Sequence, residues 1–158
     1  MRKSQREVKD PEELRRILES CDVCHLGLSD DGQPYVVALN YGFELIEGQL
    51  TLYFHCAPAG RKLDIIRRND RACFQIDCSC QLKTGDLACQ YSMNYESLIG
   101  SGPVEIVDDP DEKAAGLRIL MNHYSGKLAW EFDPQILERT LVLRLRVVEF
   151  CGKRLQRA

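Results

Sequence analysis

The sequence predicts a mainly β protein in which antiparallel strands form a small barrel with a few helices at its periphery. Alternating apolar and polar segments separated by turn residues occupy the region from Val23 to His55. Two other segments open with Asp-Pro followed by acidic residues, the usual pattern of a helix N-terminus. With 158 residues, 44% of them apolar, the chain is long enough for one well-buried domain and short for two. We therefore expect residues 1–158 to form a single domain.

The first third of the chain contains one helix followed by hairpin-connected strands. Asp10 is a candidate N-cap, and the helix is expected to run from about Pro11 to Glu19. The turns at Asp30-Asp31-Gly32 and Glu47-Gly48 separate the strands that follow. These expected strands are Val23–Ser29, Pro34–Ile46 and Leu50–His55.

The rest of the chain combines long strands with two more helices. Gly100 and Gly102 interrupt one strand, and we interpret them as a bend at a barrel corner rather than as a site where a cofactor approaches. The segment between Asp77 and Tyr91 has no clear period and is expected to be a mobile or inserted loop that covers a site or projects into solvent. The expected elements are strands at Ala72–Asp77, Tyr91–Val107 and Thr140–Phe150, and helices at Pro110–Tyr124 and Pro134–Arg139.

Charge and hydropathy limit the classes of partner. The formal charge of −3 and the sequence pI near 5.7 give no overall electrostatic attraction to nucleic acid or anionic lipid. The amino terminus is polar, and no apolar run is long enough to cross a bilayer. We expect a cytoplasmic protein that binds neither nucleic acid nor membrane.

Eight cysteines are present, and without a signal peptide we expect them to be reduced thiols. The pairs Cys21-x-x-Cys24 and Cys78-x-Cys80, with Cys89 further on, resemble zinc or iron–sulfur ligand spacings. However, Cys21 ends an expected helix while Cys24 lies inside an expected strand, which is not the tight knuckle that presents paired thiolates to a metal. We expect no metal site, and a cysteine-based metal protein stays a less favoured hypothesis.

A helix that begins with two cations is the most informative feature. The strand Leu50–His55 leads through a short connector to a helix that opens on Arg61 and Lys62, with no capping side chain at Ala59 or Gly60. A cation in the first turn is unfavourable by about 0.3 to 1 kcal/mol. Either an anion binds here, accepting hydrogen bonds from the backbone and from both cations, or the two side chains extend into water where salt screens the penalty.

The kind of anion is restricted by the motifs that are missing. The chain has neither a GxGxxG turn after a first strand nor a GxxxxGK[ST] phosphate loop. Tyr53 and His55 share a strand next to another that carries Tyr35, Asn40 and Tyr41. Such flat rings and polar tips suit a planar heterocycle with a phosphorylated tail.

Three runs, PYVVALNYGFE, LTLYFHCAPAGRKLDII and CQYSMNYESLIGSGPVEIV, in that order and approximate spacing, resemble the flavin-binding split-barrel family that includes the pyridoxamine 5′-phosphate oxidases. The similarity is to the nitroimidazole-resistance (Nim) branch in particular and covers nearly the whole chain. It implies a six-stranded antiparallel split β-barrel, a homodimer, and flavin mononucleotide (FMN) in a groove between the two barrels. Two departures are Ala38, where Nim sequences often carry proline, and the cysteine-rich segment from Cys78 to Cys89.

The resemblance also implies site residues, matched motif to motif. Arg61 and Lys62 would hold the phosphate, and Ser97 would approach the flavin through its hydroxyl or backbone. The remaining implied contacts are Val37, Ala38, Leu39 and Asn40 along the ribityl chain and ring, and Phe54 and His55 beside the flavin.

The function implied is that of an FMN-dependent oxidoreductase that passes electrons from a nicotinamide donor, NADH or NADPH, to a small-molecule acceptor such as a 5-nitroimidazole-like nitroaromatic compound. His55 is the candidate proton donor or acceptor because an imidazole titrates near neutrality, but an ordinary hydrogen-bonded histidine at a strand end is an equal alternative. For His25 and His123 we favour structural roles, and for Trp130 core filling. A non-catalytic flavin- or haem-binding or sensing protein of the same fold is the main alternative function.

Overall fold

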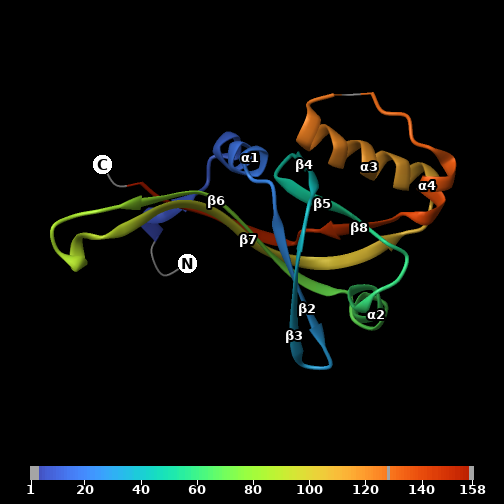
Figure 1. Ribbon diagram of the computed structural model, residues 1–158, viewed down its shortest axis with the longest axis horizontal. Helices are drawn as coiled ribbons and strands as arrows, with labels where there is room; N and C mark the ends of the chain where they lie inside the picture. Colours follow the sequence, from blue (N-terminus) through green and yellow to red (C-terminus); the bar gives the residue numbers. More distant parts are fainter. Residues whose placement is uncertain (1–3, 128, 157–158) are drawn as a thin grey trace.

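The computed structural model describes residues 4–127 and 129–156, in which antiparallel strands predominate and helices pack at the periphery (Figure 1). The predicted mainly β split barrel is confirmed, although the described residues contain nine strands rather than six. None of the described helices is long and apolar enough to cross a membrane. The strands are β1 (Glu7–Val8), β2 (Cys24–Asp30), β3 (Gln33–Leu39), β4 (Gly42–Ile46), β5 (Gln49–Cys56), β6 (Arg71–Lys83), β7 (Ser92–Val107), β8 (Leu141–Arg146) and β9 (Glu149–Leu155). The helices are α1 (Pro11–Ser20), α2 (Arg61–Arg68), α3 (Pro110–Ser125) and α4 (Pro134–Arg139), with short 3₁₀ turns η1 (Ser4–Arg6) and η2 (Ala88–Gln90).

Strand β7 joins the two halves of the sheet. The strand order is β3-β2-β6-β7-β8-β5-β4, and β9 pairs with β7 and β1 beside this path. The first part of β7 pairs with β6 and β9, whereas its last residues, from Val104 to Val107, pair with β8. Gly102 lies at this change of partner, where a Cβ atom would be 2.0 Å from the carbonyl oxygen of Arg146. The glycine therefore permits close backbone approach at the barrel corner, which agrees with our interpretation of the glycine pair.

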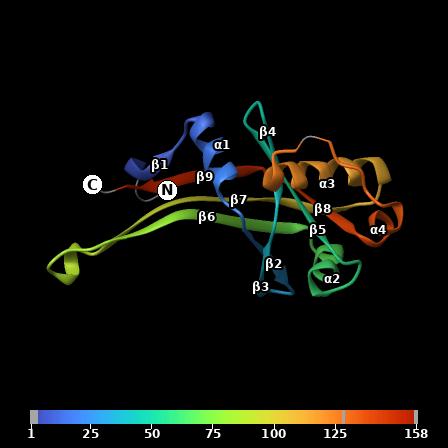
Figure 2. The same cartoon turned by 45° about the horizontal axis from the view of Figure 1, so that its top comes forward.

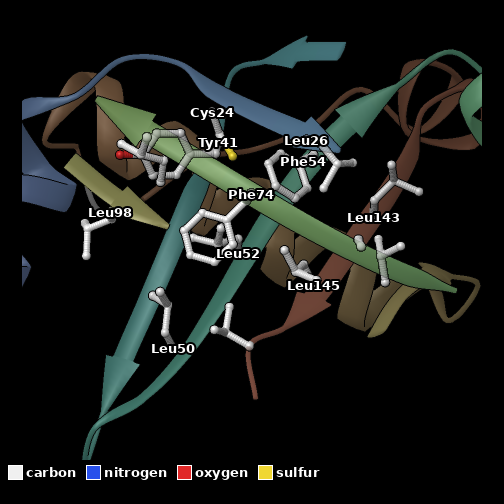
Figure 3. Close-up of a cluster of buried hydrophobic side chains, with 14 of the residues drawn as sticks. Cys24, Leu26, Tyr41, Leu50, Leu52, Phe54, Phe74, Leu98, Leu143 and Leu145 are labelled. Atoms are coloured by element: carbon white, nitrogen blue, oxygen red, sulfur yellow. The ribbon is translucent and has the colours of Figure 1, made fainter. Parts of the chain in front are cut away.

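One large apolar core lies between the two halves of the sheet, and a second, smaller one lies under α3. The alternation along β5 sends Leu52 and Phe54 into the large core, where they meet side chains of β2, β6 and β8 (Figure 3). Tyr53 points the opposite way and packs with Leu117 of α3 in the smaller core. Strand β5 is therefore covered on both faces along most of its length.

Two expected strands are each divided in the structure. The segment Pro34–Ile46 forms β3 and β4, because the ring of Tyr41 turns into the core and its hydroxyl donates to the carbonyl of Leu18 at 2.6 Å. The segment Thr140–Phe150 forms β8 and the start of β9, because the backbone of Val147 leaves β8 and donates to the carbonyl of Leu50 at 3.0 Å. In both cases a tertiary contact breaks a pattern that is continuous in the sequence.

The first half of the segment between Asp77 and Tyr91, which we expected to be a loop, is strand. Strand β6 continues to Lys83 and pairs with the start of β7, so that the two strands form an arm that projects away from the helices (Figures 1 and 2). A bulge between Cys78 and Gln81 interrupts the register, and Ser79 there has a φ of 57°. The expectation of a loop was wrong for residues 78–83, because pairing with β7 makes them part of a strand although their side chains follow no regular pattern. The remaining residues, 84–90, lie outside the strands and include the short turn η2.

A network of charged side chains attaches α1 to the sheet near the base of this arm. Glu96 of β7 is almost fully buried and accepts hydrogen bonds from Arg16 of α1 and from Arg154 of β9, the latter at 2.5 Å. Ser79 also donates to Glu96, at 3.2 Å, and Arg154 pairs with Glu13. The buried carboxylate is therefore satisfied from three separate elements.

Candidate functional site

The start of α2 has the features that the sequence predicted. Gly60 is the N-cap residue, with a φ of +139° and no side-chain hydrogen bond to the helix. A Cβ atom added to Gly60 would meet nothing within 4 Å, so the space beside the first turn is open. The helix thus begins without a cap and presents backbone N–H groups to an open surface.

The structure adds a carboxylate that the sequence did not indicate. Asp30, at the end of β2, accepts hydrogen bonds at 3.2 and 3.1 Å from Arg61 and at 2.5 Å from Arg68. The guanidinium of Arg61 also lies 4.8 Å from the ring centroid of Tyr35. The cation at the helix start is therefore tolerated partly because β2 supplies an opposite charge.

Lys62 lies on the more buried side of the same turn. Burial raises the pKa of the nearby Cys56 thiol, and the positive charge of Lys62 partly opposes this effect. The open backbone at Gly60 and the two cations fit a phosphate-sized anion, with Asp30 as an internal competitor for Arg61. Arg61 and Lys62 both lie in the first helical turn beside this open space.

The residues of β3 do not share one face. Val37 and Leu39 are partly buried and pack against the large core, whereas Ala38 is exposed on the outer face of the sheet. Asn40 is exposed beyond the end of β3, and its side-chain amide donates to the carbonyl of Asp22 at 3.2 Å. A ligand on the outer face would meet Ala38 directly, and would meet Val37 and Leu39 only through their backbone.

Phe54 and His55 point to opposite faces of β5. Phe54 is fully buried in the large core, so its side chain is not accessible to a ligand in this arrangement. His55 is exposed and borders a mainly apolar cavity of about 260 Å³ beneath α3 and α4. The apolar residues lining this cavity are Leu117, Leu120, Met121, Phe132, Ile136 and Leu137.

Ser97 borders a different cavity, of about 460 Å³, at the base of the arm. It is opposite Asp77 on one neighbouring strand and Lys153 on the other. This cavity lies in the half of the sheet that contains β6, β7 and β9, whereas His55 belongs to the half that contains β5 and β8. The structure therefore does not bring Ser97 and His55 into one cavity within a single chain.

An open face extends across β3, β2, β6, β7 and β9. A row of cross-strand neighbours on this face runs from Ala38 through His25 and Gln75 to Ile99 and Cys151. Ile99 is 53% exposed. The sequence reasoning missed this row, although the alternation of a buried Cys24 with an exposed His25 could have indicated it.

The other two histidines and the tryptophan have simpler environments. A ring nitrogen of His123 lies 3.0 Å from the carbonyl oxygen of Cys21, and the ring packs against Tyr41, which are contacts that a structural role requires. His25, in contrast, lies exposed on the open face, with Nδ1 at 3.9 Å from an oxygen of Asp77. The indole of Trp130 donates to the carbonyl of Lys127 in the α3–α4 connection and fills no part of either apolar core.

The cysteines do not form a metal-binding cluster in the part of the chain that the structure describes. No group of three or more histidine, cysteine, aspartate or glutamate side chains is arranged there to hold a metal ion. All eight cysteines are free thiols. Cys24 is fully buried, and burial raises the pKa of its thiol to about 12.

Comparison with known proteins gives consistent matches over nearly the whole chain. Residues 10–154 match the family model described as pyridoxamine 5′-phosphate oxidase. A candidate 5-nitroimidazole antibiotic resistance protein from Bacteroides thetaiotaomicron has a similar structure, with 31% identity, 93% of this chain and 85% of that chain covered, and a TM-score of 0.79. No curated protein matches.

Two further solved structures support the fold alone, because their sequence identities are low. The flavocytochrome Anf3 from Azotobacter vinelandii is 22% identical, with 97% of this chain and 71% of that chain covered and a TM-score of 0.77. An FAD- and haem-binding protein from Mycobacterium smegmatis is 18% identical, with 96% and 74% covered and a TM-score of 0.81.

Proposed function

Because the chain belongs to the pyridoxamine 5′-phosphate oxidase family, we propose that it binds FMN as a homodimer and acts as a flavin-dependent oxidoreductase. The observation that carries the proposal is the uncapped start of α2, where Gly60 leaves open space beside Arg61 and Lys62. This arrangement supplies backbone donors and positive charge beside an open space, with Asp30 as the competing acceptor for Arg61. A phosphate monoester fits both properties.

In this proposal Arg61 and Lys62 hold the phosphate, and the ring lies along the outer side of β3 near Ala38. Tyr35, which already packs beneath the Arg61 guanidinium, keeps that side chain at the helix start. The open face contains exposed apolar side chains, including Val36 and Ile99, that a second copy would cover. Ser97 would then belong to the shared groove, whose walls come from both copies.

When bound, the flavin supplies hydride or single-electron transfer between a nicotinamide donor and an acceptor. The chain contributes binding, orientation of the ring and protection from water. His55 would transfer protons to or from the acceptor at a ring nitrogen, from the edge of the apolar cavity under α3 and α4. The similarity to the Bacteroides protein supports a nitroaromatic acceptor. Reduction of a nitro group consumes protons, which is why this acceptor requires a proton donor.

A visible spectrum of the purified protein tests the cofactor class. Oxidised flavin gives two broad bands and haem one sharp intense band, so the spectrum also distinguishes the alternative of a haem-binding protein. If the protein is colourless and does not bind added FMN at low salt, the proposal is wrong.

The phosphate site is tested by replacing both cations. We expect Arg61→Ala combined with Lys62→Ala to weaken FMN binding by at least about tenfold, because each charge-assisted hydrogen bond contributes about 1.5 to 3 kcal/mol. Arg67→Ala is the matched control, since Arg67 lies in the same helix and pairs only with the exposed Asp64 among the contacts described. Fluorescence titration with FMN measures the affinity of the double variant and of the control. Equal affinities for the double variant and the wild type would contradict the assignment of the phosphate site.

Replacing Asp30 tests the same site in the opposite direction. Asp30→Asn removes the carboxylate that competes for Arg61 and Arg68, so we expect FMN to bind more tightly than in the wild type. If the two arginines serve only to pair with Asp30, the substitution will leave FMN affinity unchanged. Titration at two salt concentrations separates this local effect from general charge.

Catalysis requires its own assay. We expect reoxidation of the reduced, FMN-loaded protein by nitroaromatic acceptors to be faster than that of free FMN, and His55→Ala to lower this rate more than it lowers FMN affinity. Reoxidation no faster than that of free FMN would favour a non-catalytic flavin-binding protein. Equal rates for His55→Ala and wild type at saturating FMN would exclude the proton-transfer role.

A further inference from the structure

Two thiols that are distant in sequence meet where α1 ends against the base of the arm. Cys21 is the C-cap residue of α1 and is fully buried, and Cys78 lies in β6, partly buried and packed against the large core. The hydroxyl oxygen of Ser20 lies 3.6 Å from the sulfur of Cys78. The Cys78 thiol and the Ser20 hydroxyl lie near enough to the Cys21 thiol to influence its pKa.

The bulge in β6 fixes the position of Cys78. Phe74 and Ile76 alternate into the core, and Cys78 continues this inward alternation towards α1. The bulge begins at the next residue, Ser79, whose hydroxyl donates to the sulfur of Cys78 at 3.7 Å and to Glu96 at 3.2 Å. The same residue that bends the arm therefore also contacts the thiol and the buried charge network.

The two thiols differ in access. Burial raises the pKa of the Cys21 thiol, and the neighbouring Cys78 thiol adds to this effect. Cys21 is shielded from solvent, whereas Cys78 is only partly buried at the base of the arm. A soluble oxidant would meet Cys78 first, with Cys21 positioned behind it.

We propose that Cys21 and Cys78 form a reversible redox pair that hydrogen peroxide converts to a disulfide. In the first step the Cys78 sulfur attacks one peroxide oxygen, an S–O bond forms, the O–O bond breaks, and the released hydroxide takes up the thiol proton to give water. In the second step the Cys21 sulfur attacks the sulfur of the Cys78 sulfenic acid, an S–S bond forms, the S–O bond breaks, and hydroxide leaves as water with the Cys21 proton. The two thiols lose two electrons, and the peroxide is reduced to two water molecules.

The disulfide would attach the end of α1 covalently to the base of the arm. Asp77, the residue before Cys78, borders the cavity that contains Ser97. Oxidation would therefore fix the strand segment that forms one wall of this cavity. The pair does not depend on the proposed FMN site, so a failure of either proposal leaves the other open.

Peptide mapping of the wild-type protein tests the pair without any variant. We expect dilute hydrogen peroxide, followed by alkylation of remaining thiols, to protect two of the eight cysteines from alkylation, and a thiol reductant to restore both. After digestion with trypsin, the peptide from Ala72 to Lys83 contains Cys73, Cys78 and Cys80. A second digestion, with a protease that cleaves after Phe74, separates Cys73 from the other two cysteines. Fragment masses should then assign the link to Cys21 and Cys78 within one chain.

Matched variants complete the test. We expect Cys78→Ser to abolish the link and Cys80→Ser to leave it intact, because Cys80 is exposed and its sulfur contacts only the Cys78 carbonyl among the contacts described. A link between any other two cysteines, a link between chains, or oxidation of Cys80 and Cys89 while Cys21 and Cys78 stay reduced would each overturn the proposal. Absence of any link after peroxide treatment would overturn it as well.

Discussion

At the scale of single residues, Glu96 illustrates how this protein buries a charge. Burial alone would raise the pKa of Glu96, but hydrogen bonds from Arg16 and Arg154 outweigh burial and lower its pKa. The ionised carboxylate therefore stabilises the folded state at neutral pH. Because the folded pKa lies below the unfolded value of about 4.3, this contribution is complete above that value and is lost as the pH falls through the folded pKa.

We expect Glu96→Gln to lower the free energy of unfolding by about 1.5 to 3 kcal/mol at pH 7, the usual contribution of hydrogen bonds to a charged group. The variant should also lose less stability than the wild type on acidification below about pH 4, since it lacks one group with a lowered pKa. Glu105→Gln is the control, because Glu105 pairs with Arg144 and Arg146 in a more exposed position. Urea unfolding at both pH values measures the differences, and equal losses for the two variants would contradict the expectation.

The sequence predicts side-chain direction well and distant partners poorly. The alternation in β5 correctly predicts that Phe54 and His55 face opposite sides, and the structure buries the first and exposes the second. The ion pair between Arg61 and Asp30 joins residues 31 positions apart on different elements, so no local pattern indicates it. The alternation around His25 indicates which side chains are exposed, but it does not show that they form a row, because the members of the row come from five strands.

At the scale of elements, α1 and α3 show that one sequence signal has two outcomes. Both helices begin with Asp-Pro and an acidic first turn. Asp109 accepts hydrogen bonds from the backbone of Asp111 and Glu112, at 3.0 and 2.9 Å, whereas the side chain of Asp10 makes no cap hydrogen bond. The sequence therefore predicts where both helices start but not which start the side chain stabilises.

We expect Asp109→Ala to lower the free energy of unfolding by about 1 kcal/mol, the usual effect of removing an N-cap side chain. The same change at Asp10 should cost clearly less, because no side-chain hydrogen bond is lost there. Chemical denaturation of the two variants measures the difference. If both variants lose equal stability, the cap geometry does not account for the effect.

The irregular elements could not be predicted from periodicity because tertiary contacts determine them. The break between β3 and β4 depends on the burial of Tyr41 against Leu18, and the arm depends on pairing between β6 and β7. The regular elements required no such contact, and the expected helix Pro134–Arg139 has the observed bounds of α4. Sequence reasoning thus succeeds for elements whose bounds are determined by their own residue pattern and not by tertiary contacts.

At the scale of the whole molecule, the open face of the sheet is a surface whose apolar side chains stay exposed in the single chain. It combines exposed Ile99 and Val36 with small residues such as Gly27 and Ala38. Such a face is suited to burial against a second copy, as the proposed homodimer requires. The phosphate site at α2 and the Ser97 cavity would then contribute to one groove from different copies.

We expect Ile99→Asp to yield a monomer that binds FMN weakly, because the charge would be buried in the proposed interface. Ile46→Asp is the control, since Ile46 is similarly exposed but lies at the end of β4, outside the open face. Light scattering after size exclusion measures the mass of each variant. A wild-type protein that is monomeric, or an Ile99→Asp variant that keeps both dimer and affinity, would contradict the proposed arrangement.

The shared strand β7 has a consequence for how the protein unfolds. Its first part is hydrogen-bonded between β6 and β9 and its last part to β8, so the two halves of the sheet have a continuous backbone in common. Neither half can lose its strands without exposing the edge of the other, and partial opening is therefore costly. The fold should behave as one cooperative unit, whose amide hydrogens exchange most slowly in the middle of β7.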